Sequence, residues 1–220
     1  MFAVGKFTKT RKSIIEFGCM LLDNGLIVGT WGNLSARVDG TDYIAITPSG
    51  RNYRSLESED IVVVDLEGTI ISGDLKPSSE MALHLAIYKS RPDINAVIHT
   101  HSVFASACAV ARQAIPPIVE DVVQLVGGTV KVAEYALNGS NQLAQNAVTA
   151  LGENNAVLLA NHGVVGCGTN LNEAKVACEL VEKAAQIYIY ANQLPGGAKV
   201  LADDDVAVMH DYYLKYYRQS

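Results

Sequence analysis

The sequence predicts an α/β protein in which helices pack on the faces of a mixed, mainly antiparallel sheet. Segments with helical periodicity are interspersed with pairs of short apolar segments joined by tight turns, and such pairs are typical of β-hairpins. Of the 220 residues, 49% are hydrophobic and 18% are charged, which suits a compact globular enzyme. At this length the simplest interpretation is a single domain over residues 1–220 with a substantial buried core.

The first half of the chain reads as one helix followed by short strands. Apolar residues recur at helical spacing over 8–24, and Gly25 closes that helix. Two β-branched runs, 43–47 and 61–65, predict strands, and the second turns directly into a further strand at 70–71.

The second half alternates helices with strands. A helix begins near Pro77-Ser78-Ser79-Glu80, where proline and serine mark a helix start. The remaining predicted elements are a strand leading into His99, a helix over 102–112, a short strand at 130–132, a helix over 140–151, a hairpin around His162, and helices over 171–192 and 204–217.

The most informative segment is His99-Thr100-His101, which follows the apolar run Ala96-Val97-Ile98. Residues two apart on a strand point to the same face, so both imidazoles can converge on one point. Imidazole is the commonest neutral metal ligand, and a stiff strand holds two of them rigidly. The alternative interpretation is a pair of hydrogen-bonded structural histidines.

His162 lies in a similar context, after the apolar run 156–160. The segment Asn161-His162-Gly163 is expected to form a tight turn between two strands, with Gly163 supplying the backbone freedom. A histidine at this strand end is a candidate third metal ligand. Alone, it would more simply be a histidine hydrogen-bonded across a turn.

Glu80 is expected in the first turn of its helix, where the helix dipole favours a carboxylate. His84 lies one turn further on the same face, and Glu-x-x-x-His can itself hold a metal. We rank His84 below the other histidines, because Leu83 and Leu85 indicate a helix packed against the body of the protein.

Three segments combine small residues with exposed amides and hydroxyls, a composition that suits an anion. Each segment alone is also an ordinary turn sequence. Ser78-Ser79 adjoins Glu80, which would place an anion and a metal within one substrate length. The three segments are 30–35, 47–50 and 78–79.

Composition excludes several other classes of protein. The net charge is −6 and no basic run is present, which argues against a nucleic acid partner. The longest apolar stretch, Val103–Ala111, is broken by Ser106 and is too short to span a bilayer, so no membrane association is expected. Residues 1–6 lack the apolar core of a signal peptide.

The four cysteines form no C-x-x-C pair, which is typical of reduced thiols in a cytoplasmic protein. The alternative is that Cys167, which lies between two glycines, is a reactive thiol.

Taken together, five motifs are similar to those of the zinc-dependent class II aldolases of the fuculose-phosphate aldolase group. The wider superfamily also holds ribulose-phosphate 4-epimerases, methylthioribulose-phosphate dehydratases, aromatic acid decarboxylases and the adducin head domain. The resemblance spans nearly the whole chain, in order and at family-like spacing. The motifs are Gly-Asn-Leu-Ser at 32–35, Ile-Thr-Pro-Ser-Gly at 46–50, Pro-Ser-Ser-Glu at 77–80, His-Thr-His at 99–101 and Asn-His-Gly at 161–163.

The resemblance implies a three-layer α/β/α fold with a central, mostly antiparallel sheet, in a homotetramer whose active sites lie at subunit interfaces. It implies Zn²⁺, with Mn²⁺ or Co²⁺ as alternatives, held by His99, His101, His162 and Glu80. Glu80 would leave the metal to act as acid or base. The implied phosphate-binding residues are Thr30, Gly32, Asn33, Thr47, Ser49, Gly50, Ser78 and Ser79.

One departure from the family pattern concerns the second proton-transfer group. Fuculose-phosphate aldolases carry an interface tyrosine some twenty residues past the His-x-His motif, where this chain has no tyrosine. Glu120 is the best match to that position and Asp121 is the next candidate. Tyr216 matches the family's C-terminal tyrosine, or alternatively belongs to a helical aromatic face packed on a neighbouring subunit.

The expected function is therefore reversible cleavage of a ketose 1-phosphate to dihydroxyacetone phosphate and an aldehyde. Fuculose, rhamnulose and 5-deoxyribulose 1-phosphates are all plausible substrates. The acidic residue at position 120 keeps a sugar-phosphate dehydratase or a pentulose-phosphate 4-epimerase open, although the epimerase branch usually has Asp where this chain has Glu80. A decarboxylase or a non-catalytic adducin-like domain is less consistent with the retained phosphate and metal motifs.

Overall fold

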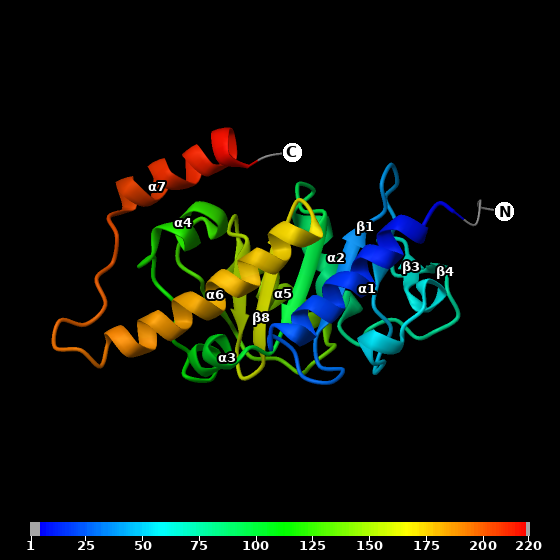
Figure 1. Ribbon diagram of the computed structural model, residues 1–220, viewed down its shortest axis with the longest axis horizontal. Coiled ribbons are helices and arrows are strands. Elements are labelled where there is room, and N and C mark those ends of the chain that lie inside the picture. Colours follow the sequence, from blue (N-terminus) through cyan, green and yellow to red (C-terminus); the bar gives the residue numbers. More distant parts are fainter. Residues whose placement is uncertain (1–4, 219–220) are drawn as a thin grey trace.

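A computed structural model describes residues 5–218, and a single eight-stranded sheet runs through its centre (Figure 1). The strand order is β4-β3-β2-β1-β5-β8-β7-β6, and every neighbouring pair is antiparallel except β6 and β7. This confirms the predicted mixed, mostly antiparallel sheet. The strands are β1 (Asn33–Arg37), β2 (Ile44–Ile46), β3 (Val62–Val64), β4 (Ile70–Ser72), β5 (Ala96–Thr100), β6 (Val132–Ala133), β7 (Ala156–Leu159) and β8 (Gly163–Gly168).

Helices cover both faces of the sheet, which confirms the three-layer α/β/α arrangement. Because side chains alternate along a strand, Ile44 and Ile46 join the core under α2 and α5, while Ala45 joins the core under α1 and α6. Figure 1 shows α1 and α6 lying across one face. The helices are α1 (Thr8–Asp23), α2 (Met81–Ser90), α3 (Val103–Val110), α4 (Glu120–Val126), α5 (Asn141–Leu151), α6 (Leu171–Ala191) and α7 (Asp203–Tyr212).

Side-chain caps fix where the two best-predicted helices begin. The Ser140 hydroxyl accepts a hydrogen bond from the Leu143 amide at the start of α5, and Asn170 accepts one from the Glu173 amide at the start of α6. The last helix is shorter than the expected 204–217, because α7 ends at Tyr212 and continues as a π-helical turn over Tyr213–Tyr217.

One strand, β1, and one α-helix, α4, were missed in the sequence. Residues 30–35 were expected as an anion-binding loop, but the loop ends at Gly32 and β1 begins at Asn33, in the middle of the sheet. Ser35 is fully buried there because its hydroxyl has distant partners on α2. The short helix α4 follows Pro116-Pro117 and is only 7 residues long, too short for a periodic signal.

The turn before β8 also differs from expectation. The residue with a left-handed backbone is Asn161, with φ of 55°, and Gly163 already belongs to the strand. Glycine is required at 163 for a different reason, because a Cβ there would lie 2.3 Å from the carbonyl oxygen of Thr100. Within residues 5–218, no helix combines the length and apolarity needed to cross a bilayer.

Candidate active site

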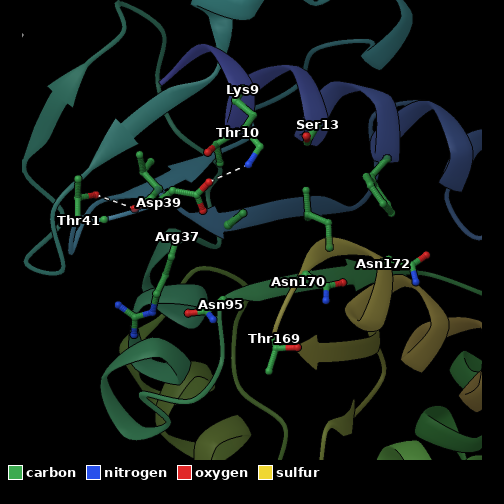
Figure 2. A pocket seen from close by; sticks show the side chains of 15 residues that line it. Lys9, Thr10, Ser13, Arg37, Asp39, Thr41, Asn95, Thr169, Asn170 and Asn172 are labelled. Carbon is green, nitrogen blue, oxygen red and sulfur yellow. Dashed lines mark hydrogen bonds and ion pairs between the residues drawn. The ribbon is translucent and has the colours of Figure 1, made fainter. Parts of the chain in front are cut away.

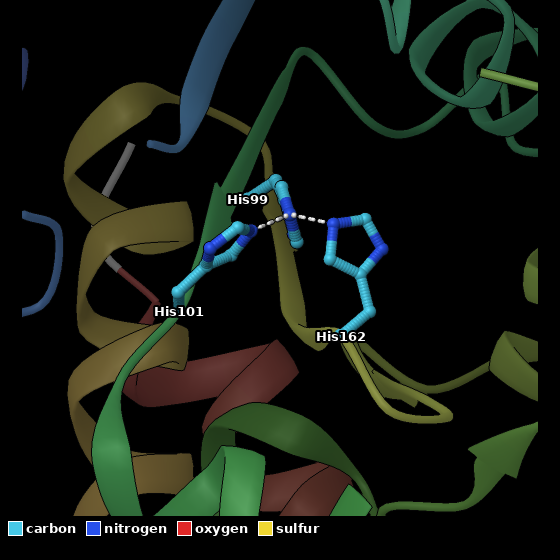
Figure 3. Close-up of side chains that lie close together, drawn as sticks. All are labelled: His99, His101 and His162. Carbon is cyan, nitrogen blue, oxygen red and sulfur yellow. Dashed lines mark hydrogen bonds between the residues drawn. The ribbon is translucent and has the colours of Figure 1, made fainter. Parts of the chain in front are cut away.

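Three histidines from two neighbouring strand ends converge on one point, as predicted (Figure 3). His99 lies near the end of β5, His101 follows that strand, and His162 lies in the turn between β7 and β8, which pairs with β5. The Nε2 atom of His99 lies 2.8 Å from Nε2 of His101 and 3.2 Å from Nε2 of His162. The antiparallel register therefore brings together side chains 63 positions apart.

The tautomer of His99 is set by the backbone. Its Nδ1 lies 3.0 Å from the Val164 carbonyl oxygen, which can only accept, so Nδ1 carries the proton and Nε2 presents a lone pair to the cluster. Burial, followed by the neighbouring His162 and His101, lowers the pKa of His99 well below its usual value. Burial also lowers the pKa of His101, again with a contribution from His162. Both rings are therefore neutral at neutral pH, the form that binds metal.

Glu80 completes the cluster. Its Oε2 lies 3.3 Å from Nε2 of His99 and its Oε1 lies 3.6 Å from Nε2 of His162. Asn33 donates from Nδ2 to Oε2 at 2.8 Å, whereas Oε1 is buried and has no hydrogen-bond partner among the described residues. The expectation that Glu80 lies in the first helical turn is wrong by one residue, since Glu80 is the N-cap of α2 and its amide donates to the Ser78 hydroxyl.

These four side chains fit a divalent metal ion. Atoms bound tetrahedrally to zinc at about 2.0–2.1 Å lie about 3.3 Å from one another. The separations of His99 Nε2 from the other two histidines, and of the Glu80 oxygens from His99 and His162, range from 2.8 to 3.6 Å. A carboxylate oxygen buried without a partner is costly unless a cation or donor faces it, and Oε1 of Glu80 is such an atom. The donor set of three imidazoles and one carboxylate is one that zinc accepts.

His84 does not join this cluster. Its ring is fully buried between β1 and α2, with Nδ1 2.7 Å from the Ser35 hydroxyl and Nε2 2.5 Å from Oδ1 of Asn33. Both ring nitrogens are therefore occupied. Burial lowers the pKa of His84 to about 3, so the ring is neutral.

A cavity of about 420 Å³ opens beside the histidines and Glu80. The loops at 47–50 and 76–79 meet along its wall, since the Ser49 amide donates to the Lys76 carbonyl and the Ser78 amide donates to the Thr47 carbonyl. The three polar segments singled out in the sequence therefore converge. Seven of the eight expected anion-binding residues line the cavity: Thr30, Gly32, Asn33, Ser49, Gly50, Ser78 and Ser79.

Thr47 is the exception, because its side chain does not line the cavity. The residue is buried, and its hydroxyl accepts a hydrogen bond from the Leu34 amide at 3.2 Å. Its carbonyl oxygen accepts from the Ser78 amide. Thr47 thus ties β1 to the loop that carries Ser78 and Ser79.

Sequence reasoning gave no role to several side chains of the cavity wall. Trp31 is 65% exposed, and its ring lies 6.4 Å from that of His101 with an interplanar angle of 30°. Trp31 lies inside the polar segment 30–35, and a large aromatic side chain next to Gly32 was the signal that could have identified it. Asn161 also lines the cavity and stood beside His162 in a recognised motif, whereas Tyr135 and Asn138 come from a segment without such a signal.

The three proposed proton-transfer residues do not reach this cavity within one chain. Glu120 is exposed at the start of α4, and Asp121 pairs with Lys183 on α6. Tyr216 is 73% exposed. Its neighbour Tyr213 donates a hydrogen bond to Glu173 in the first turn of α6. Glu173 follows the last residue of β8, whereas His162 precedes the first residue of that strand.

A second cavity, of about 450 Å³, lies at the opposite end of β1 and β5 (Figure 2). Its charged Lys9 and Asp39 pair with each other at 3.0 Å. Its wall also contains Asn95 and the start of α6, but none of the histidines. The histidine cluster therefore borders the first cavity and not the second.

Comparison with known proteins agrees with this geometry. Residues 12–189 match the family described as class II aldolase and adducin N-terminal domain. The chain is 37% identical over 198 residues to 5-deoxy-D-ribulose 1-phosphate aldolase of Bacillus thuringiensis, covering 90% of this chain and 92% of the relative. It is 35% identical over 208 residues to L-fuculose phosphate aldolase of Escherichia coli, covering 94% and 95% of the two chains.

A solved structure supports the same assignment. The structure of an L-fuculose 1-phosphate aldolase superimposes with a TM-score of 0.90 at 37% identity, covering 94% of this chain and 97% of that chain. The fold and the family resemblance are thus confirmed together. The chain belongs to the class II aldolase and adducin family, and it is an enzyme of the aldolase type.

Proposed function

We propose that this protein is a zinc-dependent lyase that reversibly cleaves a ketose 1-phosphate to dihydroxyacetone phosphate and an aldehyde. The observation that carries the proposal is the buried Oε1 of Glu80, which has no hydrogen-bond partner among the described residues and lies beside three clustered imidazoles, next to a cavity walled by small polar residues. The relatives named as aldolases of fuculose phosphate and 5-deoxyribulose 1-phosphate support this substrate class.

His99, His101, His162 and Glu80 would hold the ion. When bound, zinc supplies Lewis acidity toward the carbonyl and hydroxyl oxygens of the substrate, which stabilises the negative charge that develops there. Three neutral ligands leave the full charge of the ion available for this purpose.

The phosphate would lie against the two joined loops without a lysine. Ser49, Gly50 and Ser79 line the cavity from these loops, and Ser78 retains a hydroxyl hydrogen because its oxygen only accepts from the Glu80 amide. Hydroxyl and amide donors near the start of α2 suit an oxyanion, because the helix dipole adds a favourable field there.

Glu80 would move the proton on carbon. In cleavage, the bond between C3 and C4 breaks, its electron pair passes toward the ketone oxygen, and C3 then takes a proton from the Glu80 carboxyl. In condensation, the same carboxylate removes that proton. A positioned acid or base of this kind contributes about 10²–10⁴-fold in rate.

The second proton, on the hydroxyl of C4, needs another group. We place this role on Glu120 or Tyr216 of a second copy, with Asp121 as the next choice, in a homotetramer with active sites at subunit interfaces. Support comes from their positions, since both Glu120 and Tyr216 are exposed and lie away from the cavity of their own chain.

The experiment is condensation of dihydroxyacetone phosphate with single aldehydes by the zinc-loaded enzyme. Acetaldehyde would give a 5-deoxypentulose phosphate and lactaldehyde a 6-deoxyhexulose phosphate, so product mass identifies the chain length. A Glu80→Gln variant serves as the matched control. Absence of any new ketose phosphate with every aldehyde contradicts the aldolase proposal.

A sugar-phosphate dehydratase on the same site is the second candidate. The observation that favours it is the carboxylate of Glu120, the best match in this sequence to the position where fuculose-phosphate aldolases carry a tyrosine. A dehydratase would release water from a ketose phosphate and leave a product 18 mass units lighter, about the mass of one water, without forming any aldehyde. The same mass measurement therefore separates the two reactions.

A further inference from the structure

A chain of four buried side chains extends from Glu80 away from the cavity, and the reaction scheme above uses none of them beyond Asn33. Asn33 Nδ2 lies 2.8 Å from Glu80 Oε2, and Asn33 Oδ1 lies 2.5 Å from His84 Nε2. The Ser35 hydroxyl lies 2.7 Å from His84 Nδ1 and 2.8 Å from the Tyr88 hydroxyl. All of these residues are at most 6% exposed.

The direction of every bond in this chain follows from the hydrogen bond that Asn33 Nδ2 donates to Glu80 Oε2. A carboxylate only accepts, so Asn33 must turn its NH₂ group toward Oε2 and its carbonyl oxygen toward His84. That carbonyl oxygen also only accepts, so the His84 proton resides on Nε2. The reversed amide would place two acceptors 2.8 Å apart in a dry site.

The rest of the chain is then determined. A neutral imidazole with its proton on Nε2 accepts at Nδ1, so Ser35 donates its hydroxyl hydrogen to His84. Ser35 has no second hydrogen, so the Tyr88 hydroxyl donates to Ser35. All four donors thus point toward Glu80, and each bond strengthens the next in a low-dielectric environment.

We propose that His84 is a positioning residue for Glu80, which it controls through the amide of Asn33. By donating to Asn33 Oδ1, His84 holds the NH₂ group against Oε2 of Glu80. Oε1 is thereby left free to face the histidine cluster, where its separation from His162 Nε2 is 3.6 Å. This inference rests on the proposed acid–base role of Glu80.

His84 is suited to this task because hydrogen bonds hold both its backbone and its ring. It lies one turn after Glu80 on α2, and its amide donates to the Glu80 carbonyl, so ring and carboxylate are carried by one helix. Asn33, at the start of β1, is opposite His99 in the sheet. The chain therefore links the helix that carries Glu80 to the strands that carry the histidines.

The test compares His84→Phe with His84→Gln in the zinc-loaded enzyme. Phenylalanine fills the space without a donor, so we expect kcat to fall about 100-fold, as for a misplaced general base, with KM and zinc content unchanged. Glutamine keeps an N–H donor near the Nε2 position and is expected to recover at least about 10-fold of that loss. Tyr88→Phe is the graded comparison, since it removes only the hydroxyl at the far end of the chain, and its kcat should fall less than that of His84→Phe.

A spectroscopic measurement on the unmodified protein keeps the inference falsifiable if His84→Phe does not fold. Nitrogen-15 NMR distinguishes the two imidazole tautomers, and we expect His84 to carry its proton on Nε2. A proton on Nδ1, or a His84→Phe enzyme with undiminished kcat, overturns the inference. A wild-type enzyme without aldolase activity would instead overturn the proposed function, while the tautomer still tests the hydrogen-bond chain.

Discussion

Arg112 and Asn161, the two non-glycine residues with positive φ within residues 5–218, are hydrogen-bonded to each other. Their φ values are 57° and 55°, and the Arg112 guanidinium donates to Oδ1 of Asn161 while also donating to the Ala109 carbonyl at the end of α3. Asn161 immediately precedes His162. The left-handed conformation is costly for most residues but is tolerated by asparagine, and such residues cluster at functional sites.

This relationship predicts that Asn161→Ala weakens zinc binding more than Asn161→Gly. Both variants lose the contact with Arg112, but only alanine opposes the left-handed backbone, by about 1–2 kcal/mol. If zinc requires the native turn at His162, that strain corresponds to about a 10-fold difference in Kd. Competition with a chromophoric chelator measures both constants. Equal affinities would show that the turn does not position His162.

Trp31 should report metal binding directly. It is the single tryptophan of the chain, and its ring is stacked beside that of His101. Binding of a cation at His101 alters the electric field at the indole, so we expect chelation to change the emission of the wild-type protein. Adding zinc should restore the original spectrum.

The matched control for this measurement is His101→Ala, which keeps Trp31 but removes the ring beside it. Its emission should no longer respond to zinc at concentrations that saturate the wild type. An emission spectrum indifferent to zinc in the wild type, while metal analysis shows full loading, would contradict the assignment of His101 as a ligand.

The sequence predicts the histidine cluster well because its signals are local. His99 and His101 share a strand face, and His162 follows an apolar run, so convergence needs only that the two strand ends meet. The strand β1 gives no such signal, since its polar Asn33 and Ser35 are buried by partners on α2 that are distant in the chain. Propensity alone cannot recognise a polar residue whose partner comes from tertiary structure.

The two residues proposed to act at a second copy's cavity set a second limit on prediction from sequence. Glu120 and Tyr216 are named from family motifs, and a single chain places neither beside Glu80. The C-terminal segment is held elsewhere, because Arg218 and Tyr213 both donate to the Glu173 carboxylate on α6. No pattern within one sequence encodes the position of a second copy.

The Glu173 carboxylate predicts a specific acid sensitivity. Burial would raise its pKa, but hydrogen bonds from Arg218 and Thr169 outweigh burial and lower the pKa of Glu173 from 4.5 to about 2. A lowered folded-state pKa contributes stability above pH 4.5 that is lost as the pH falls toward 2. Between pH 6 and pH 3, unfolding free energy should fall by about 2 kcal/mol more in the wild type than in Glu173→Gln.

Urea unfolding of the metal-free proteins at both pH values measures this difference. Chelator is present throughout, so that no metal is bound to the histidines of either protein. A parallel decline in the two proteins would show that the Glu173–Arg218 pair does not carry the predicted acid sensitivity.

Mixing two inactive variants tests whether Tyr216 acts on another copy. Chains with Glu80→Gln keep Tyr216, and chains with Tyr216→Phe keep Glu80, so a mixed oligomer contains some sites with both native groups. If each site takes Glu80 from one chain and Tyr216 from the next, random assembly of equal amounts restores about a quarter of the sites. Refolding the two variants together, followed by an activity assay, measures the recovery.

The control mixture is Glu80→Gln with His101→Ala. Glu80 and His101 lie in the same cavity of one chain, so every site in that mixture retains at least one of the two lesions. Activity is therefore expected from the first mixture and not from the second. If mass spectrometry shows mixed oligomers of Glu80→Gln and Tyr216→Phe chains and no activity returns, Tyr216 does not serve a neighbouring site. The exposed tail, with Tyr216 at 73% exposure, would then be a packing surface between copies.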